Sequence, residues 1–126
     1  MEKSYLISGT LFILLSIILG AFGSHALRPV LPESSFYGYT VATHYLGFQG
    51  LGLLVIGLLQ AHYEIPTLVY KGLFWGTVIF SGSILLLNLG KLMGWNLRFL
   101  GPVTPIGGLM LLLSWVLLLR FFIRLT

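Results

Sequence analysis

The segment Leu11–Leu19 reads LFILLSIIL, an apolar run in which Ser16 is the one polar residue. It lies within a longer apolar stretch from about Tyr5 to Ala26. Three further stretches of this kind follow, at about Tyr39 to Ala61, Thr67 to Leu89 and Pro105 to Phe122. Each approaches or exceeds the roughly 20 residues that a helix needs to cross about 30 Å of hydrocarbon. The pattern predicts four transmembrane helices.

The composition of the whole chain indicates the same environment. Of its 126 residues, 57% are hydrophobic and 8% are charged, whereas a soluble domain carries about a quarter charged residues. A soluble body of this size could not bury so many apolar side chains, because small domains have a high surface-to-volume ratio. The composition therefore excludes a soluble enzyme, a disordered chain and a nucleic-acid-binding domain.

Prolines separate the predicted spans, because proline lacks a backbone donor and restricts the residue before it. Pro29 and Pro32 end the first span and Pro66 starts the third. Thr104 is expected to cap the fourth helix. The aromatic-rich segment Glu33–Thr40 is interpreted as a short interfacial helix at headgroup level. We therefore expect an all-α integral membrane protein with one domain, residues 1–126, built as a four-transmembrane-helix bundle with this interfacial helix between spans 1 and 2.

Four spans place both termini and the second loop at one end of the bundle, called side A, and the first and third loops at the other, called side B. Four basic residues fall on side A and three on side B: Lys3, Lys71, Arg120 and Arg124 against Arg28, Lys91 and Arg98. The positive-inside rule then favours cytoplasmic termini. We expect the protein in a bacterial inner membrane, where its net charge of +4 favours anionic headgroups.

The residues that catalysis requires are scarce. The chain has no Cys and no Asp, and its three acidic residues, Glu2, Glu33 and Glu64, lie in a terminus or in loops. No thiolate, iron–sulfur or Cys-ligated zinc chemistry is possible. His25 and His44 could meet near side B, but two histidines without a carboxylate or cysteine make a poor metal or haem site. We therefore expect no enzyme activity, no cofactor and no metal, and the lack of a carboxylate within any span argues against proton-coupled export.

Small residues recur at helical spacing within the spans, which lets transmembrane helices approach closely. Gly72 and Gly76 form a GxxxG pair. The glycines expected to pack helices are Gly20, Gly23, Gly72, Gly76, Gly82, Gly107 and Gly108. Thr77, Ser81 and Asn88 share one face of the third span. Two interpretations stay open for these three: hydrogen bonds between helices, or the lining of a small polar cavity.

Three blocks, GAFGSHAL at residues 20–27, FSGS at 80–83 and GPVTPIGG at 101–108, carry a family resemblance. They are similar to the signature blocks of the domain-of-unknown-function 423 family, small four-span membrane proteins that include eukaryotic transmembrane protein 256. The resemblance covers nearly the whole chain and implies the fold and a membrane location, but no chemistry. Family members usually carry a histidine in the second span where this chain has Gln49, which further weakens a metal or haem interpretation.

The predicted helix directions bring these blocks together in the side-B half of the bundle, with Arg98 in the preceding loop. We hypothesise there a pocket for an anionic lipid headgroup; the alternative is that the same residues serve only helix packing. The candidate pocket residues are His25, Gln49, Ser81, Ser83, Arg98 and Thr104.

Two functions stay open. The favoured one is a non-catalytic membrane protein that acts as an accessory or structural subunit of a membrane complex or as a lipid-binding membrane-integrity factor. Its expected partners are anionic lipids and either further copies of itself or a larger complex, but no nucleic acid. The alternative is a small oligomeric channel or transporter for a small polar solute, lined by Thr77, Ser81, Asn88 and Gln49.

Overall fold

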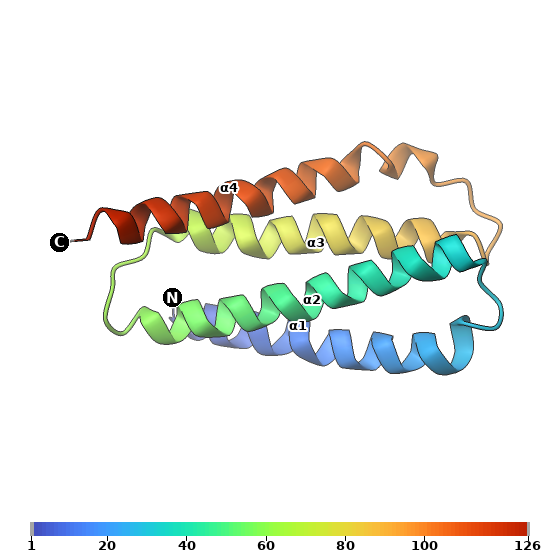
Figure 1. The fold of residues 1–126 in the computed structure, drawn as a ribbon, viewed down its shortest axis with the longest axis horizontal. Coiled ribbons are helices and arrows are strands. Elements are labelled where there is room, and N and C mark those ends of the chain that lie inside the picture. Colours follow the sequence, from blue (N-terminus) through green and yellow to red (C-terminus); the bar gives the residue numbers. More distant parts are fainter. Residues whose placement is uncertain (1, 126) are drawn as a thin grey trace.

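The computed structural model describes residues 2–125 and shows four long helices that run back and forth along one axis (Figure 1). In chain order the elements are α1 (Glu2–Phe22), the π-helical turn η1 (Gly23–Leu27), α2 (Glu33–Leu59), α3 (Thr67–Gly90), the 3-10 turn η2 (Arg98–Leu100) and α4 (Val103–Ile123). All four α-helices are long and apolar enough to cross a membrane. The prediction of an all-α bundle of four transmembrane helices is confirmed. The predicted domain, 1–126, reaches one residue beyond the described range at each end.

Proline directly precedes three of the four helices: Pro32 before α2, Pro66 before α3 and Pro102 before α4. Two predicted boundaries were wrong. The expected interfacial helix is the first two turns of α2, which continues without a break to Leu59. At 27 residues α2 is about 40 Å long, so it can cross the hydrocarbon and still place these turns among the headgroups. Likewise α4 begins at Val103, and no side chain caps it.

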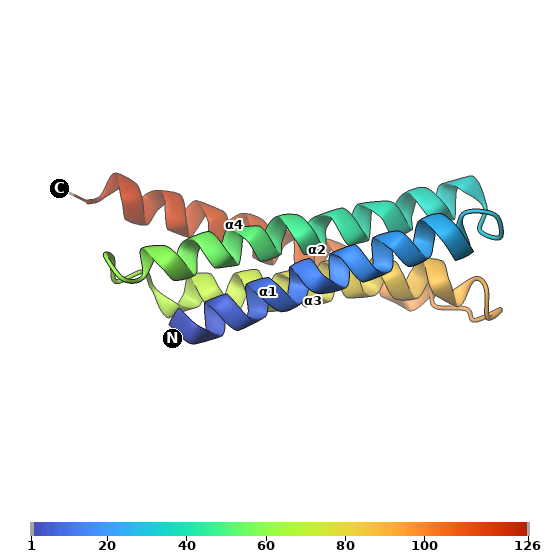
Figure 2. The ribbon, with the colours of Figure 1, turned by 90° about the horizontal axis from the view of Figure 1, so that it is seen from below.

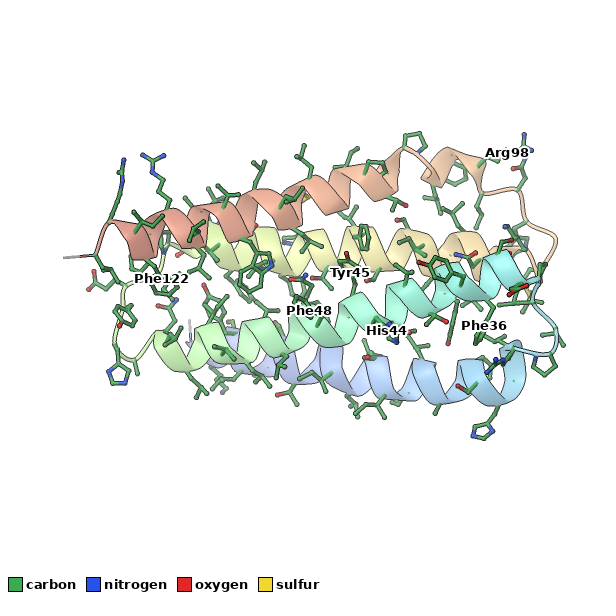
Figure 3. The ribbon with its side chains drawn as sticks, in the orientation of Figure 1. Phe36, His44, Tyr45, Phe48, Arg98 and Phe122 are labelled. Atoms are coloured by element: carbon green, nitrogen blue, oxygen red, sulfur yellow. The ribbon has the colours of Figure 1, made fainter. Side chains whose placement is uncertain are left out.

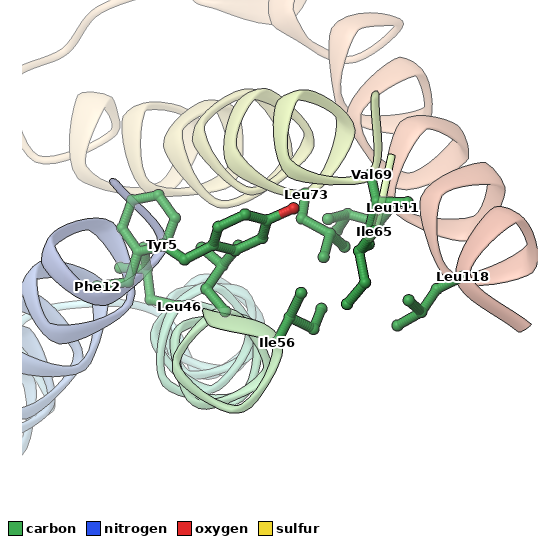
Figure 4. Packing of buried hydrophobic residues seen from close by; sticks show 10 residues of the cluster. Tyr5, Phe12, Leu46, Ile56, Ile65, Val69, Leu73, Leu111 and Leu118 are labelled. Atoms are coloured by element: carbon green, nitrogen blue, oxygen red, sulfur yellow. The ribbon is translucent and has the colours of Figure 1, made fainter. Parts of the chain in front are cut away.

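Helices that are consecutive in the sequence pack against one another. α2 and α3 form the middle of the bundle, with α1 and α4 on opposite sides of this pair (Figures 1 and 4). The start of α1 and the end of α4 lie at the same end of the bundle as the α2–α3 connection, as Figures 1 and 2 show. That end is side A, and η1 and η2 lie at side B.

Aromatic side chains join α1 to α3 across the centre of the bundle. The rings of Tyr5 and Tyr70 lie 4.7 Å apart, and those of Phe12 and Phe74 are stacked at 5.5 Å. The Ser8 and Tyr70 hydroxyls form a 2.6 Å hydrogen bond. The main buried cluster, shown in Figure 4, consists of Tyr5, Phe12, Leu46, Leu53, Ile56, Ile65, Val69, Leu73, Leu111 and Leu118.

The outward faces of the helices are apolar as well. Ile17 of α1 is 65% exposed and Leu112 of α4 is 64% exposed. Such faces suit lipid tails, because inside a bilayer the apolar surface needs no cover. The apolar outer faces are therefore consistent with a bundle that is surrounded by lipid.

Candidate functional site

Two of the six predicted pocket residues meet. Ser83 of α3 and Thr104 of α4 form a hydrogen bond of 2.6 Å between their hydroxyl oxygens. The Ser83 hydroxyl also lies 3.0 Å from the carbonyl oxygen of Phe80, and the Thr104 hydroxyl lies 3.5 Å from that of Leu100, so both hydroxyl protons have acceptors within the protein. The pair ties α3 to α4 near side B and leaves no donor for a ligand.

The structure does not assemble the rest of the predicted pocket. His25 and Arg98 are both exposed, and Arg98 lies at the outer edge of the side-B end (Figure 3). Ser81 is buried, and its hydroxyl has no hydrogen-bond partner within the described chain. None of these three lines a cavity described below. The hypothesis of a headgroup pocket built from Arg98, Thr104 and His25 therefore has no geometric support.

Gln49 lies deeper than the sequence suggested. Because α2 begins at Glu33, Gln49 is the seventeenth of its 27 residues, about 5 Å beyond the middle of the helix towards side A. Its side-chain oxygen Oε1 accepts a 2.9 Å hydrogen bond from the indole Nε1–H of Trp115 on α4. Gln49 is only 4% exposed. This bond joins α2 to α4 in the central part of the bundle, not in its side-B half.

Beside this pair, a groove of about 750 Å³ opens between α2 and α4. Tyr45 and Phe48 of α2, marked in Figure 3, line it together with Gln49. The remaining lining residues come from α3 and α4: Phe80, Pro105, Gly108, Leu109, Leu111, Leu112 and Trp115. A concave, mostly apolar site with a few polar groups is the usual form of a small-molecule site, and its volume falls in the usual range of about 300–1,000 Å³.

A second, more polar pocket of about 310 Å³ lies between α1 and α2 near side B. Its charged residue is Arg28, directly after η1, whose guanidinium lies 5.7 Å from the centre of the Phe36 ring. Arg28 also lines an adjoining cavity of about 400 Å³ that includes Glu33. The other residues of the 310 Å³ pocket are Ser16, Gly20, Gly23, Ser24, Tyr39, Thr40, Thr43 and His44. We call this site the Arg28 pocket.

Several hydroxyls of the Arg28 pocket hold its walls in place. Tyr39 donates to the carbonyl oxygen of Leu19 at 2.5 Å, and Ser16 donates to that of Thr43 at 2.8 Å. Both bonds join α1 to α2. The π-helical turn η1 forms part of the wall and closes with a 2.9 Å bond from the Arg28 amide to the Gly23 carbonyl. Turns of this kind occur often at functional sites.

The predicted packing glycines divide into two groups. A Cβ atom built on Gly23 would overlap the Tyr39 ring, and one on Gly72 would overlap Ser114. At Gly76 it would meet Leu111, and at Gly107 the backbone of Phe80; at Gly108 it would make only ordinary contact with the Phe80 ring. At Gly20 and Gly82, however, it would meet no described atom within 4 Å. These last two glycines are not packing residues, and Gly20 instead lines the Arg28 pocket.

Two of the three residues of the polar face predicted on α3 make hydrogen bonds within their own helix, whereas the third, Ser81, has no partner within the described chain. Thr77 donates to the Leu73 carbonyl at 2.7 Å, and the Asn88 amide donates to the Ile84 carbonyl at 2.8 Å. Both partners lie four residues earlier in the same helix. Neither side chain makes a hydrogen bond to another helix or lines a cavity described above, although Asn88 packs against Gly38 of α2.

Sequence reasoning missed Arg28 and Trp115 as site residues. A tryptophan in the middle of a span was the available signal, because a buried indole N–H needs an acceptor. For Arg28 the available signal was its spacing from Ser24. Residues four apart lie on the same face of a helix, so the two polar side chains could be expected to line one site. The close contact of Gly9 with Gly50, which brings α1 against α2, was also missed.

Comparison with known proteins supports the family resemblance. Residues 19–108 match the family model described as "Protein of unknown function (DUF423)". The UPF0382 membrane protein of Staphylococcus epidermidis is 38% identical over 92% of both chains. The UPF0382 membrane protein YwdK of Bacillus subtilis is 31% identical over 92% of this chain and 93% of its own length. No solved structure matches the chain.

The matched region contains all three sequence blocks, and the relatives are bacterial membrane proteins of the same length class. Together with the four spanning helices, these similarities define both the membrane nature and the family of this protein. The chain belongs to the DUF423 family of membrane proteins.

Proposed function

We propose that this protein is a non-catalytic integral membrane protein that binds an anionic phospholipid headgroup in the Arg28 pocket. The observation that carries the proposal is the position of Arg28, at the end of a membrane-spanning segment and between two adjoining cavities of about 310 and 400 Å³. The end of a span is the depth at which lipid phosphates lie. A guanidinium binds phosphate oxygens through two parallel hydrogen bonds.

The surroundings of Arg28 suit a phosphodiester. The Ser24 hydroxyl and the His44 ring lie in the same pocket and can donate to further phosphate oxygens. Three basic residues and one acidic residue, Arg28, Lys91, Arg98 and Glu33, lie at this end, so its formal charge is +2. Lys91 is anchored to Ser35 by a 3.0 Å hydrogen bond, which leaves Arg28 as the cation placed in the pocket.

The non-catalytic part of the proposal is supported by the sequence, which lacks Asp and Cys and has no acidic residue in the middle of a span. Within the favoured class, the Arg28 pocket supports lipid binding more directly than a role as an accessory subunit. We place the protein in the bacterial inner membrane with cytoplasmic termini, supported by the four basic residues of side A against three on side B.

Native mass spectrometry of the purified full-length protein tests the lipid proposal. We expect the wild-type protein to retain an anionic phospholipid and Arg28→Gln to lose most of it. Arg98→Gln is the matched control, because Arg28 and Arg98 are both exposed arginines at the same end and only Arg28 lines the pocket. Equal loss of anionic lipid by both variants would show that net charge, and not the pocket, attracts lipid, and wild-type retention by Arg28→Gln would refute the pocket. Fixed co-purifying proteins in place of lipid would favour an accessory subunit.

A further inference from the structure

The groove between α2 and α4 contains hydrogen-bond donors that no described residue accepts. Because an indole N–H can only donate, the oxygen of the Gln49 amide must face Trp115, and its nitrogen Nε2 is left as a donor. Within residues 2–125 neither this nitrogen nor the hydroxyl of Tyr45 donates to a partner, and both residues line the groove. Tyr45 is 41% exposed, and an amide or hydroxyl donor that faces hydrocarbon without an acceptor is costly. The groove therefore offers two donors to an occupant that carries acceptors.

The depth of Gln49 restricts where such acceptors can come from. Gln49 lies about 24 Å along α2 from its side-B start and about 15 Å from its side-A end. Water is absent from the hydrocarbon core, and the ester and phosphate oxygens of phospholipids lie near its boundaries. A plain acyl chain carries no acceptor at this depth. The occupant must therefore be a molecule that is dissolved in the hydrocarbon and has its polar atoms within it.

The shape of the groove indicates a flat, ring-bearing molecule. Phe48, Phe80 and Trp115 contribute aromatic faces, and the open side is flanked by Leu109 and Leu112, which face the lipid at 55% and 64% exposure. Tyr45 and Gln49 are four residues apart on one face of α2, so their Cβ atoms lie about 5–6 Å apart. Two donors from one helix face that open into the same groove can serve a ligand with two acceptor oxygens.

We propose that the α2–α4 groove binds an isoprenoid quinone, with the Gln49 amide and the Tyr45 hydroxyl donating to its carbonyl oxygens and its apolar tail lying towards the lipid. A quinone enters sideways from the bilayer, brings its carbonyls to mid-membrane depth and stacks on aromatic side chains. This binding site is separate from the Arg28 pocket, since Gln49 and Arg28 share no cavity.

Fluorescence of Trp115 gives a direct readout in the full-length protein. Replacing Trp75 and Trp95 with phenylalanine leaves Trp115 as the one tryptophan, and both replaced residues are exposed. Titration with decylubiquinone in lipid nanodiscs should quench it saturably, whereas decylbenzene, which has a ring and tail but no carbonyl, should bind much more weakly. Gln49→Met should weaken quinone binding about fivefold, the effect of one hydrogen bond in a membrane.

Control variants separate the groove from general effects. Leu112→Phe should obstruct the groove, whereas Leu119→Phe, an equally exposed change on the same helix outside it, should not affect binding. Gln60→Met removes the other glutamine of the chain and should leave the affinity unchanged. Arg28→Gln should also leave the quinone affinity unchanged. The lipid proposal and the quinone proposal can therefore fail independently of one another.

Three results would overturn the proposal. The first is quenching that does not saturate or is equal in the Leu112 and Leu119 variants, which indicates quinone dissolved in the bilayer. The second is equal affinity for decylbenzene, or no effect of Gln49→Met, which indicates an apolar groove without acceptor recognition. The third is a wild-type dimer that Leu112→Phe converts to monomers, which identifies a second copy of the chain as the occupant.

Discussion

Gly107→Ala is expected to destabilise the contact between α3 and α4. A Cβ atom at Gly107 would overlap the backbone nitrogen of Phe80, with its Cα at 2.8 Å and the carbonyl oxygen of Gly76 at 3.0 Å. Contacts below 3.0 Å essentially never occur for real Cβ atoms. Because all three neighbours are backbone atoms, no side-chain rotation can relieve the overlap, and the two helices must move apart.

The expected loss of unfolding free energy follows from two opposing terms. Overpacking of this kind costs about 1–3 kcal/mol, and a clash with backbone belongs in the upper part of that range. The greater helix preference of alanine over glycine offsets at most about 1 kcal/mol. The net loss should be about 1–2 kcal/mol. It is measured by unfolding the purified protein with increasing SDS in mixed micelles, followed by circular dichroism.

Gly82→Ala is the matched control, because it makes the same chemical change on α3 where a Cβ would meet no described atom within 4 Å. This variant should be as stable as the wild type or up to about 1 kcal/mol more stable. If Gly107→Ala unfolds at the same SDS fraction as Gly82→Ala, or later, the inferred close approach of α3 and α4 is wrong.

Four further predictions concern the helix contacts, the topology and the alternative function. Tyr39→Phe removes the bond to Leu19 and should cost about 0.6 kcal/mol in the same SDS assay; an unchanged midpoint would exclude this link between α1 and α2. Thr77→Val should change stability by less than about 0.5 kcal/mol, because the hydroxyl bonds only within its own helix; a larger loss would reveal an interhelical role. A C-terminal reporter that is active only in the cytoplasm should be active, and activity of a periplasm-specific reporter instead would reverse the proposed orientation. Proteoliposomes should show no flux of small polar solutes above empty liposomes; saturable flux would instead establish the channel or transporter.

The spanning helices and their separation could be predicted from the sequence, because both depend on local properties of the chain. Apolar length determines which segments can cross the hydrocarbon, and proline affects the backbone of its nearest neighbours. Even so, the start of α2 was placed six residues late. The aromatic residues of 33–40 suit both an interfacial helix and the headgroup-level turns of a longer span, and only the continuous backbone distinguishes these.

The candidate sites depended on contacts between distant residues and could not be predicted in the same way. Gln49 and Trp115 are 66 residues apart in the chain, and nothing local indicates that they share a hydrogen bond. Similarly, Gly82 and Gly107 were predicted to pack alike, yet only Gly107 faces a neighbouring backbone.

The sequence alone thus determined that the chain enters the membrane and which segments cross it, because hydrophobic transfer and proline act residue by residue. The tertiary structure decided which face of each helix meets a neighbour. The face that meets a neighbour depends on how each whole helix is rotated and how closely it approaches the next one. This arrangement decides whether a glycine permits a close contact or leaves a cavity, and whether a polar side chain finds a hydrogen-bond partner. For this reason Arg28, and not Arg98, lies in a pocket, and Gln49 lies at the centre of the bundle.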